Sequence, residues 1–338
     1  MEEILKVAIN DYQNSINKPI KESSIKIYVS NVRSLRKKMK IEGDFDNIDF
    51  VKDYDKVMET LSDLQFTTQR NYMNALIVAM YSMSDFEPDI RVKYEKKRDE
   101  FNKMYEDNLA SGIVSASQSE NYLPHDEIKK VVNDLWVEVK PIISRINKDP
   151  ISITIKQRNS LQMFVLLSIY LKYPFRNEVV DLEQISRREY NKLTDNQKAY
   201  RNMLITEQGN MAFSMNDYKT SRKYKEKMIK VDKPERLLLE KWIKLNGGNP
   251  MFMTQSTLKK LTRNELSQMF MKFFKDKTGK SISTTLLAKS LLTATISPEQ
   301  ADKLKKSAQV RGHTVDTALK IYVMSNQPIV AEQEKGAD

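Results

Sequence analysis

Most of this chain has the apolar spacing of α-helices, and one short interval has the alternating pattern of β-strands. This contrast is the sequence feature that most constrains the fold. Within residues 203–231, the runs Leu204–Thr206, Met211–Phe213 and Met228–Val231 predict three short strands. Elsewhere, apolar residues recur at helical spacing. With only 8 Gly and 10 Pro in 338 residues, a loop-rich or all-β protein is disfavoured. We therefore predict a mainly α protein with one small antiparallel sheet.

The helical segments are bounded by capping residues, prolines and glycines. The pattern predicts helices at about residues 1–16, 24–39, 67–83, 88–108, 156–172, 234–245, 257–275, 284–295, 298–309 and 315–324, and a further one after Pro124. The most apolar stretch, Met163 to Leu171, is too short to cross a membrane, and we interpret it as a buried core helix.

A stretch of small and polar residues from Leu109 to Asn121 has the composition of a linker. We therefore predict a helical domain over residues 1–110, a linker over 111–122, and a second domain over 123–338 that carries the sheet and a C-terminal tail.

The formal charge is +11, and it is concentrated in the second part of the chain. Residues 1–110 hold 18 basic and 20 acidic side chains, which leaves 38 basic and 25 acidic ones for the remainder. A basic folded domain favours a polyanionic partner such as double-stranded DNA, although a lysine-rich genome composition would also raise the charge. In the first domain, the candidate DNA-binding residues lie on helix 24–39: Lys26, Arg33, Arg36, Lys37, Lys38 and Lys40. The alternative is that this run is only a solvated face.

Several classes of function are disfavoured. The chain has no Cys and only two His, so a thiolate or His-rich metal site is excluded, and we expect no metal and no cofactor. Thr278–Ser281 resembles the end of a phosphate-binding loop, but Phe274 stands where that motif requires glycine. The first residues show no signal peptide, so we expect an intracellular protein without a membrane anchor.

Two motifs contain the candidate chemistry. Arg176 stands at a break between two apolar segments, where an arginine ordinarily caps helix carbonyls. Gly312 and His313 precede a predicted helix, and Tyr322 follows nine residues after His313. Alone, Tyr322 is more typical of a core tyrosine. The order and spacing of the motifs over about 150 residues are therefore more specific than any one of them.

Together these pieces resemble the tyrosine recombinases of the lambda-integrase type. Phe175–Leu182 is similar to the turn Gly-x-Arg-x-x-Glu-hydrophobic-x-x-Leu that carries their first catalytic arginine, with Pro174 in place of glycine. Tyr218–Ser221 and the strand after it are similar to the hairpin that carries their catalytic lysine. The final box of the family is Gly-His followed by Tyr nine residues later. Gly312, His313 and Tyr322 match this box.

The resemblance implies a helical core-binding domain, an α+β catalytic domain and phosphoryl-transfer chemistry. Tyr322 would attack the DNA phosphate and form a 3′-phosphotyrosyl bond, while Arg176 and His313 bind the phosphate oxygens. Lys219 would protonate the departing 5′ oxygen. The covalent link conserves the bond energy, so no ATP is needed, and protein cations take the place of a metal ion.

One box departs from the family pattern. The family's His-x-x-Arg box aligns best with Thr285–Ser290, which puts Ala288 at the position of the second arginine. A shift of one residue puts Lys289 there instead but loses the neighbouring matches. Ala288 is a natural loss or an engineered substitution, and we expect it to slow DNA cleavage.

The expected function is site-specific DNA recombination or integration, in a viral or mobile-element setting. The alternatives are a catalytically silent DNA-binding protein with the same fold, and a type IB topoisomerase or telomere resolvase. The resemblance implies a homo-oligomer, dimer to tetramer on DNA. The expected location is with DNA, in a prokaryotic cytoplasm, a host nucleus or a viral compartment.

Overall fold

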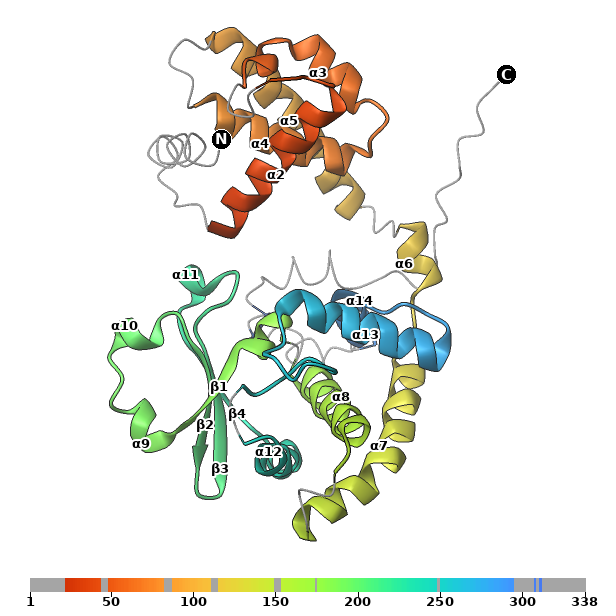
Figure 1. The fold of residues 1–338 in the computed structure, drawn as a ribbon, viewed down its shortest axis with the longest axis vertical. Helices are drawn as coiled ribbons and strands as arrows, with labels where there is room; N and C mark the ends of the chain where they lie inside the picture. Colours follow the sequence, from red (N-terminus) through yellow and green to blue (C-terminus); the bar gives the residue numbers. More distant parts are fainter. Residues whose placement is uncertain are drawn as a thin grey trace. The chain divides into compact units, whose positions relative to one another are not determined.

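The computed structural model describes residues 22–43, 48–81, 87–110, 115–148, 153–173, 175–247, 250–294, 307 and 310–311. The chain divides into two compact units, Met1–Ser111 and Gly112–Asp338. The mainly helical plan with one small sheet, expected from the sequence, is confirmed (Figure 1). Within the described residues, none of the helices combines the length and apolar character needed to cross a membrane.

The first unit is a helical bundle with its own apolar core. Its described elements are α2 (Glu22–Lys38), η1 (Asp49–Lys52), α3 (Tyr54–Leu61), α4 (Phe66–Met80) and α5 (Pro88–Ala110). The inward face of α2 buries Val32 and Leu35 against α4, where the hydroxyls of Ser34 and Tyr72 lie 3.0 Å apart. The helices therefore hold α2 with one face buried and the other in solvent.

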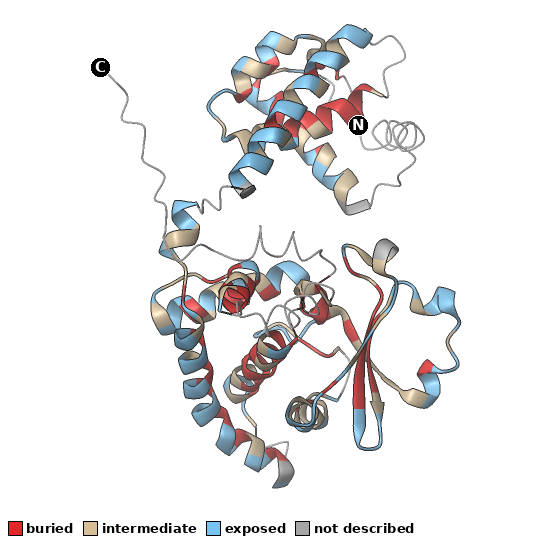
Figure 2. Ribbon diagram, turned by 180° about the vertical axis from the view of Figure 1, so that it is seen from behind, coloured by how far each residue is buried: buried red, intermediate tan, exposed pale blue. Residues whose placement is uncertain are grey.

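The second unit is built around α8 (Ile155–Lys172), whose first turn carries a complete capping box between Thr154 and Gln157. Figure 2 shows the buried residues along α8, and Leu161, Val165 and Leu166 are fully enclosed there. The other main helices of this unit are α6 (Ala116–Glu120), α7 (His125–Lys148), α12 (Lys233–Asn246), α13 (Arg263–Thr278) and α14 (Thr284–Thr293).

The sheet has four strands rather than three, and it is mixed rather than purely antiparallel. Its order is β1 (Leu182–Ser186), β2 (Asn202–Glu207), β3 (Asn210–Met215) and β4 (Lys227–Lys230). β2, β3 and β4 pair antiparallel, as predicted, but β1 pairs parallel with β2. The intervening residues 187–201, which contain α9 (Arg187–Tyr190) and α10 (Asp195–Lys198), are long enough for the crossover that a parallel pair requires.

Candidate functional site

Arg176 lies between α8 and the 3-10 helix η3 (Asn177–Asp181), where it is the residue that precedes η3. The ring of Phe175 is 2% exposed and lies edge-on to Phe213 of β3, with centroids 5.1 Å apart. The Tyr173 ring also packs on Phe213, with ring centroids 5.4 Å apart. The Tyr173 hydroxyl accepts a hydrogen bond from the backbone N–H of Asp232. The turn is therefore fixed to the sheet on one side of Arg176, which is itself half-buried.

Glu178 brings a carboxylate into this turn. It is 7% exposed, and burial raises its pKa, while Arg263, Arg176 and Arg311 act in the opposite direction. Glu178 follows Arg176 by two residues, where the tyrosine-recombinase pattern has three, and Leu182 is displaced by the same one residue. The segment therefore departs from that pattern by one residue after the arginine.

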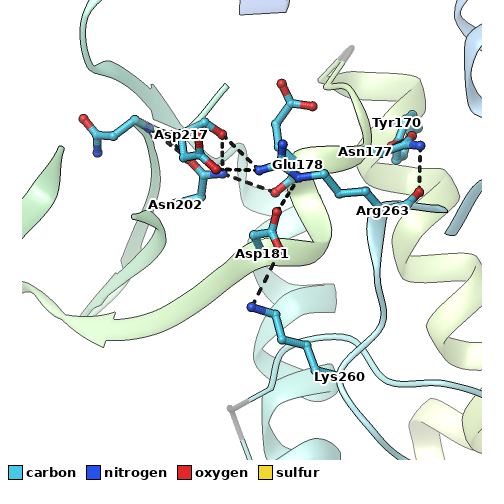
Figure 3. Close-up of polar contacts among 9 residues, drawn as sticks. Tyr170, Asn177, Glu178, Asp181, Asn202, Asp217, Lys260 and Arg263 are labelled. Carbon is cyan, nitrogen blue, oxygen red and sulfur yellow. Dashed lines mark hydrogen bonds and ion pairs between the residues drawn. The ribbon is translucent and has the colours of Figure 1, made fainter. Parts of the chain in front are cut away.

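Arg263, the first residue of α13, holds η3 against the end of β3 (Figure 3). Its Nε donates to Asp181 at 2.6 Å, and its Nη2 donates to Asp217 at 2.7 Å. Its backbone carbonyl accepts from the Asn177 side chain at 2.8 Å. With both guanidinium edges engaged by carboxylates, Arg263 is a structural residue that supports the turn rather than a ligand for an outside anion.

Lys219 lies exposed on the connection between β3 and β4, which includes α11 (Ser221–Tyr224). The start of this connection is held by Asn202, whose Oδ1 accepts from the backbone N–H of Asn216 and of Asp217, both at 2.9 Å. Further along, the Tyr218 hydroxyl donates to the Lys225 carbonyl at 2.6 Å. The connection is therefore ordered around Lys219, which itself projects into solvent.

A second lysine, Lys227 at the start of β4, lies close enough to the arginine turn for the charge of Arg176 to act on it. Its Nζ is buried, and burial together with the charge of Arg176 lowers its pKa to about 8. Sequence analysis missed this residue because the predicted strand began at Met228. The sequence does contain a signal for Lys227. Alternate residues of a strand share one face, so Lys227 lies on the same face as the apolar Ile229 and Val231.

Ala288 lies on α14 with 1% of its surface exposed, and it offers no polar group. Its neighbour Lys289 is turned toward α6, where its Nζ donates to the Gln118 side chain at 2.8 Å. Burial lowers the pKa of Lys289. In this structure Lys289 is thus held by a neutral amide of another helix.

The final box lies mostly outside the described residues, and this includes His313 and Tyr322. The residue just before Gly312 is described: Arg311 is 4% exposed. The charge of Arg311 acts to lower the pKa of Glu178 and that of the fully buried Tyr170. The Tyr170 hydroxyl donates to the Asn177 side chain of η3 at 3.2 Å. The residue that leads into the box therefore lies near the Arg176 turn.

In the first unit, five of the six candidate DNA-binding residues on and after α2 are exposed, and the sixth is not. Arg36 is 2% exposed, and its Nη2 donates to the Glu42 carbonyl at 2.9 Å, so it closes the chain after the helix rather than facing solvent. This corrects the expectation for Arg36. The exposed residues are Lys26, Arg33, Lys37, Lys38 and Lys40.

Comparison with known proteins finds similarity only among solved structures, and the similarity is distant. No family model matches this sequence, and no curated protein matches it. Among solved structures, the chain is similar to a crystal structure of XerA recombinase, with a TM-score of 0.37 and 13% sequence identity. That alignment covers 96% of this chain and 94% of the other.

Proposed function

We propose that this protein is a DNA strand-transfer enzyme of the tyrosine-recombinase type, which cuts and rejoins DNA through a 3′-phosphotyrosyl intermediate. The observation that carries the proposal is the half-buried Arg176 on its aromatic-supported turn, which acts electrostatically on the buried ammonium of Lys227. Two cations brought together in a partly dehydrated place are suited to a phosphate group.

In this mechanism the fixed Arg176 turn binds non-bridging phosphate oxygens and stabilises the charge that builds on them. His313 donates a hydrogen bond to the same group, and Tyr322 attacks phosphorus in line. A lysine of the sheet gives a proton to the departing 5′ oxygen. Arg311, which directly precedes the final box, acts electrostatically on Glu178, and this supports the proposal that His313 and Tyr322 act at the turn.

Ala288 makes this chain a slow enzyme in our proposal. An alanine at the second-arginine position removes one donor to the phosphate. The loss of a single donor of this kind costs on the order of 3 kcal/mol, or about 10²-fold in rate. DNA binding rests on many phosphate contacts and would persist.

A second candidate, favoured by Ala288 and by the attachment of Lys289 to Gln118, is a DNA-binding protein that has the fold but does not cleave. Under either candidate the partner is double-stranded DNA, contacted in the first unit by the exposed cations of α2. A dimer to tetramer on DNA, an intracellular location and an integrase role remain parts of the proposal.

Relaxation of supercoiled plasmid tests the proposal, because one-strand cutting and rejoining changes the linking number without ATP. We expect slow relaxation by this chain, faster relaxation by Ala288→Arg, and none by the double variant that also carries Tyr322→Phe. The reaction is run with a chelator and without nucleotide. Plasmid binding without relaxation in every form would favour the non-cleaving candidate.

A further inference from the structure

Asn202 is a buried amide at the start of a core strand. It is 2% exposed and is the first residue of β2, and the two residues that follow it, Met203 and Leu204, are fully buried and apolar. Asparagine is depleted in strands, and burial of a polar side chain is unfavourable unless its groups are hydrogen-bonded. Apolar packing therefore does not explain an asparagine at this position, and the explanation lies in its hydrogen bonds.

Every hydrogen-bonding position of the Asn202 amide is used. Its Oδ1 accepts from the backbone N–H groups of Asn216 and Asp217, both at 2.9 Å. Its Nδ2 donates to the carbonyl oxygen of Asp217 at 3.0 Å and to that of Glu178 at 3.4 Å (Figure 3). An asparagine side chain has two acceptor and two donor positions, whereas an ionised aspartate only accepts and a leucine does neither. The environment of Asn202 therefore favours asparagine over other side chains of its size.

These hydrogen bonds reach both segments that carry candidate catalytic side chains. Glu178 lies two residues after Arg176, and Asp217 lies two residues before Lys219. Two residues of chain span at most about 7 Å, so each candidate has its backbone within that distance of a residue bonded to Asn202. The Asn202 side chain is itself enclosed and cannot contact DNA. Its effect on a DNA reaction is therefore exerted through the residues that it holds.

Arg263 joins the same two segments a second time. Its guanidinium donates to Asp181 of η3 at 2.6 Å and to Asp217 at 2.7 Å, and its side chain is 42% exposed. One tie is therefore buried in the sheet, and the other is partly open to solvent. A connection held at one point could pivot, whereas two ties at Asp217 fix its direction. Asp217 is thus the anchor of the connection that carries Lys219.

We propose that Asn202 is a positioning residue that sets Lys219 relative to Arg176, so that both side chains act on one phosphate. The inference rests on the proposed function and adds to it the residue that couples the two segments. Asn202 forms no bond to DNA and takes no part in the proton transfer from Lys219 to the departing 5′ oxygen. Because the Arg176 turn is also packed on Phe213, loss of Asn202 releases the connection first.

Hydrogen exchange followed by NMR tests the tie without requiring cleavage. Asn202→Leu keeps the size of the side chain and removes all four hydrogen bonds, so the amide of Asp217 should exchange about tenfold faster or more. Thr206→Val is the matched control, because it removes one bond on the same strand, to the Ile185 carbonyl at 3.3 Å. It should change exchange at Asp217 by less than about twofold. Unchanged exchange at Asp217 in Asn202→Leu overturns the inference.

A second variant covers the case in which Asn202→Leu does not fold, as judged by circular dichroism and melting temperature. Asn202→Asp keeps the two accepted hydrogen bonds and loses the two donated ones, including the one that reaches Glu178. It should show the same effects as Asn202→Leu, but smaller ones.

Cleavage kinetics then separate positioning from stability. In the Ala288→Arg background, single-turnover cleavage of an oligonucleotide that the protein cuts is measured together with its affinity. We expect Asn202→Leu to slow cleavage by about tenfold or more and to leave the DNA affinity within about twofold, because a small displacement of a catalytic group is costly. Thr206→Val should change neither by more than about twofold. A rate that falls only in parallel with DNA affinity or with the fraction of folded protein overturns the inference.

A sulfur-substituted oligonucleotide decides whether Asn202 acts through Lys219. With sulfur at the 5′ bridging position, a thiolate leaves without needing a proton. We expect Asn202→Leu and Lys219→Met both to recover most of their lost rate on this DNA. A defect of Asn202→Leu that persists there overturns the inference, whatever Lys219→Met does. Absence of cleavage in every form, with exchange at Asp217 still faster in Asn202→Leu, contradicts the proposed function and leaves Asn202 as a structural residue only.

Discussion

At the scale of single residues, the proposed function makes Ala288 the position that limits the rate of DNA cleavage. It is enclosed on α14, and its methyl group cannot stabilise a phosphate. We predict that Ala288→Arg raises the rate of DNA cleavage by about 10²-fold, because it restores one donor to the transition state. The rate is measured by plasmid relaxation under single-turnover conditions.

Ala288→Met is the matched control, since it adds bulk without charge. It should leave the rate of the parent chain unchanged within about twofold. If Ala288→Arg and the parent chain relax plasmid equally fast, Ala288 does not stand at the second-arginine position, and the alignment that places Lys289 there becomes preferable.

Glu178 should make the stability of the fold depend on pH. Burial raises its folded-state pKa above the value of about 4.5 in the unfolded chain, so the folded state binds the proton more tightly. The resulting stabilisation is complete below pH 4.5 and is lost as pH rises through the raised pKa. We predict that the free energy of unfolding falls over this window relative to Glu178→Gln, in urea titrations at fixed ionic strength. A relative rise would mean that the surrounding arginines outweigh burial.

At the scale of elements, the apolar periodicity predicted most of the helices, including α2, α4, α5, α8 and α12, to within a few residues. It missed β1 because Leu182–Ser186 has no hairpin partner next to it in the sequence. A parallel partner across residues 187–201 is a tertiary contact, and local alternation contains no signal for it. Helix α13 begins at Arg263 instead of residue 257 because Met253 and Lys260 form a β-bridge around a turn at residues 255–257, where Leu258 has a positive φ of 53°.

The contact between β3 and the Arg176 turn should be important for stability. Phe213 is fully buried and meets both Tyr173 and Phe175. We predict that Phe213→Ala costs about 3–5 kcal/mol in the free energy of unfolding, since it opens a cavity under the turn. Tyr200→Ala is the control, because Tyr200 is 84% exposed and should cost less than about 0.5 kcal/mol. Comparable losses in chemical denaturation would contradict the packing described.

Helix α2 should contact phosphates through one face. Lys26, Arg33 and Lys37 recur at helical spacing along α2 and are exposed, whereas Arg36 is buried. We predict that Lys37→Gln lowers the slope of log K against log salt concentration by about 1 for a duplex of arbitrary sequence.

Arg36→Gln is the comparison for that helix. It should leave the salt slope unchanged and lower the melting temperature, because the hydrogen bond to the Glu42 carbonyl is lost. The measurement is fluorescence anisotropy with labelled DNA over a range of salt. A reversed pattern would place the DNA contact on another face of the unit.

At the scale of the whole molecule, two separate cores predict two unfolding transitions. Leu76 and Leu166 are both fully buried, one in each unit. We predict that Leu76→Ala and Leu166→Ala each destabilise one transition by about 2–5 kcal/mol and leave the other unchanged. Differential scanning calorimetry with limited proteolysis can follow the two transitions. One cooperative transition shifted by both variants would contradict independent units.

The candidate site could be predicted from sequence only in part. Arg176 stood out because it interrupts two apolar segments. Lys227 did not, because the burial of its ammonium and the effect of the Arg176 charge on it arise only in the folded sheet. Arg36 was assigned to the wrong environment because a charged helix residue can bend back onto a nearby carbonyl. His313 and Tyr322 remain sequence-based predictions.

The most direct test of the central claim is to map a covalent protein–DNA bond. The Ala288→Arg form is incubated with the plasmid DNA that it relaxes, denatured, digested with nuclease and protease, and analysed by mass spectrometry. We predict a nucleotide attached through a 3′ phosphate to the peptide that contains Tyr322, and loss of that adduct in the form that also carries Tyr322→Phe. An adduct on another residue, or relaxation without any adduct at Tyr322, would contradict the proposed mechanism.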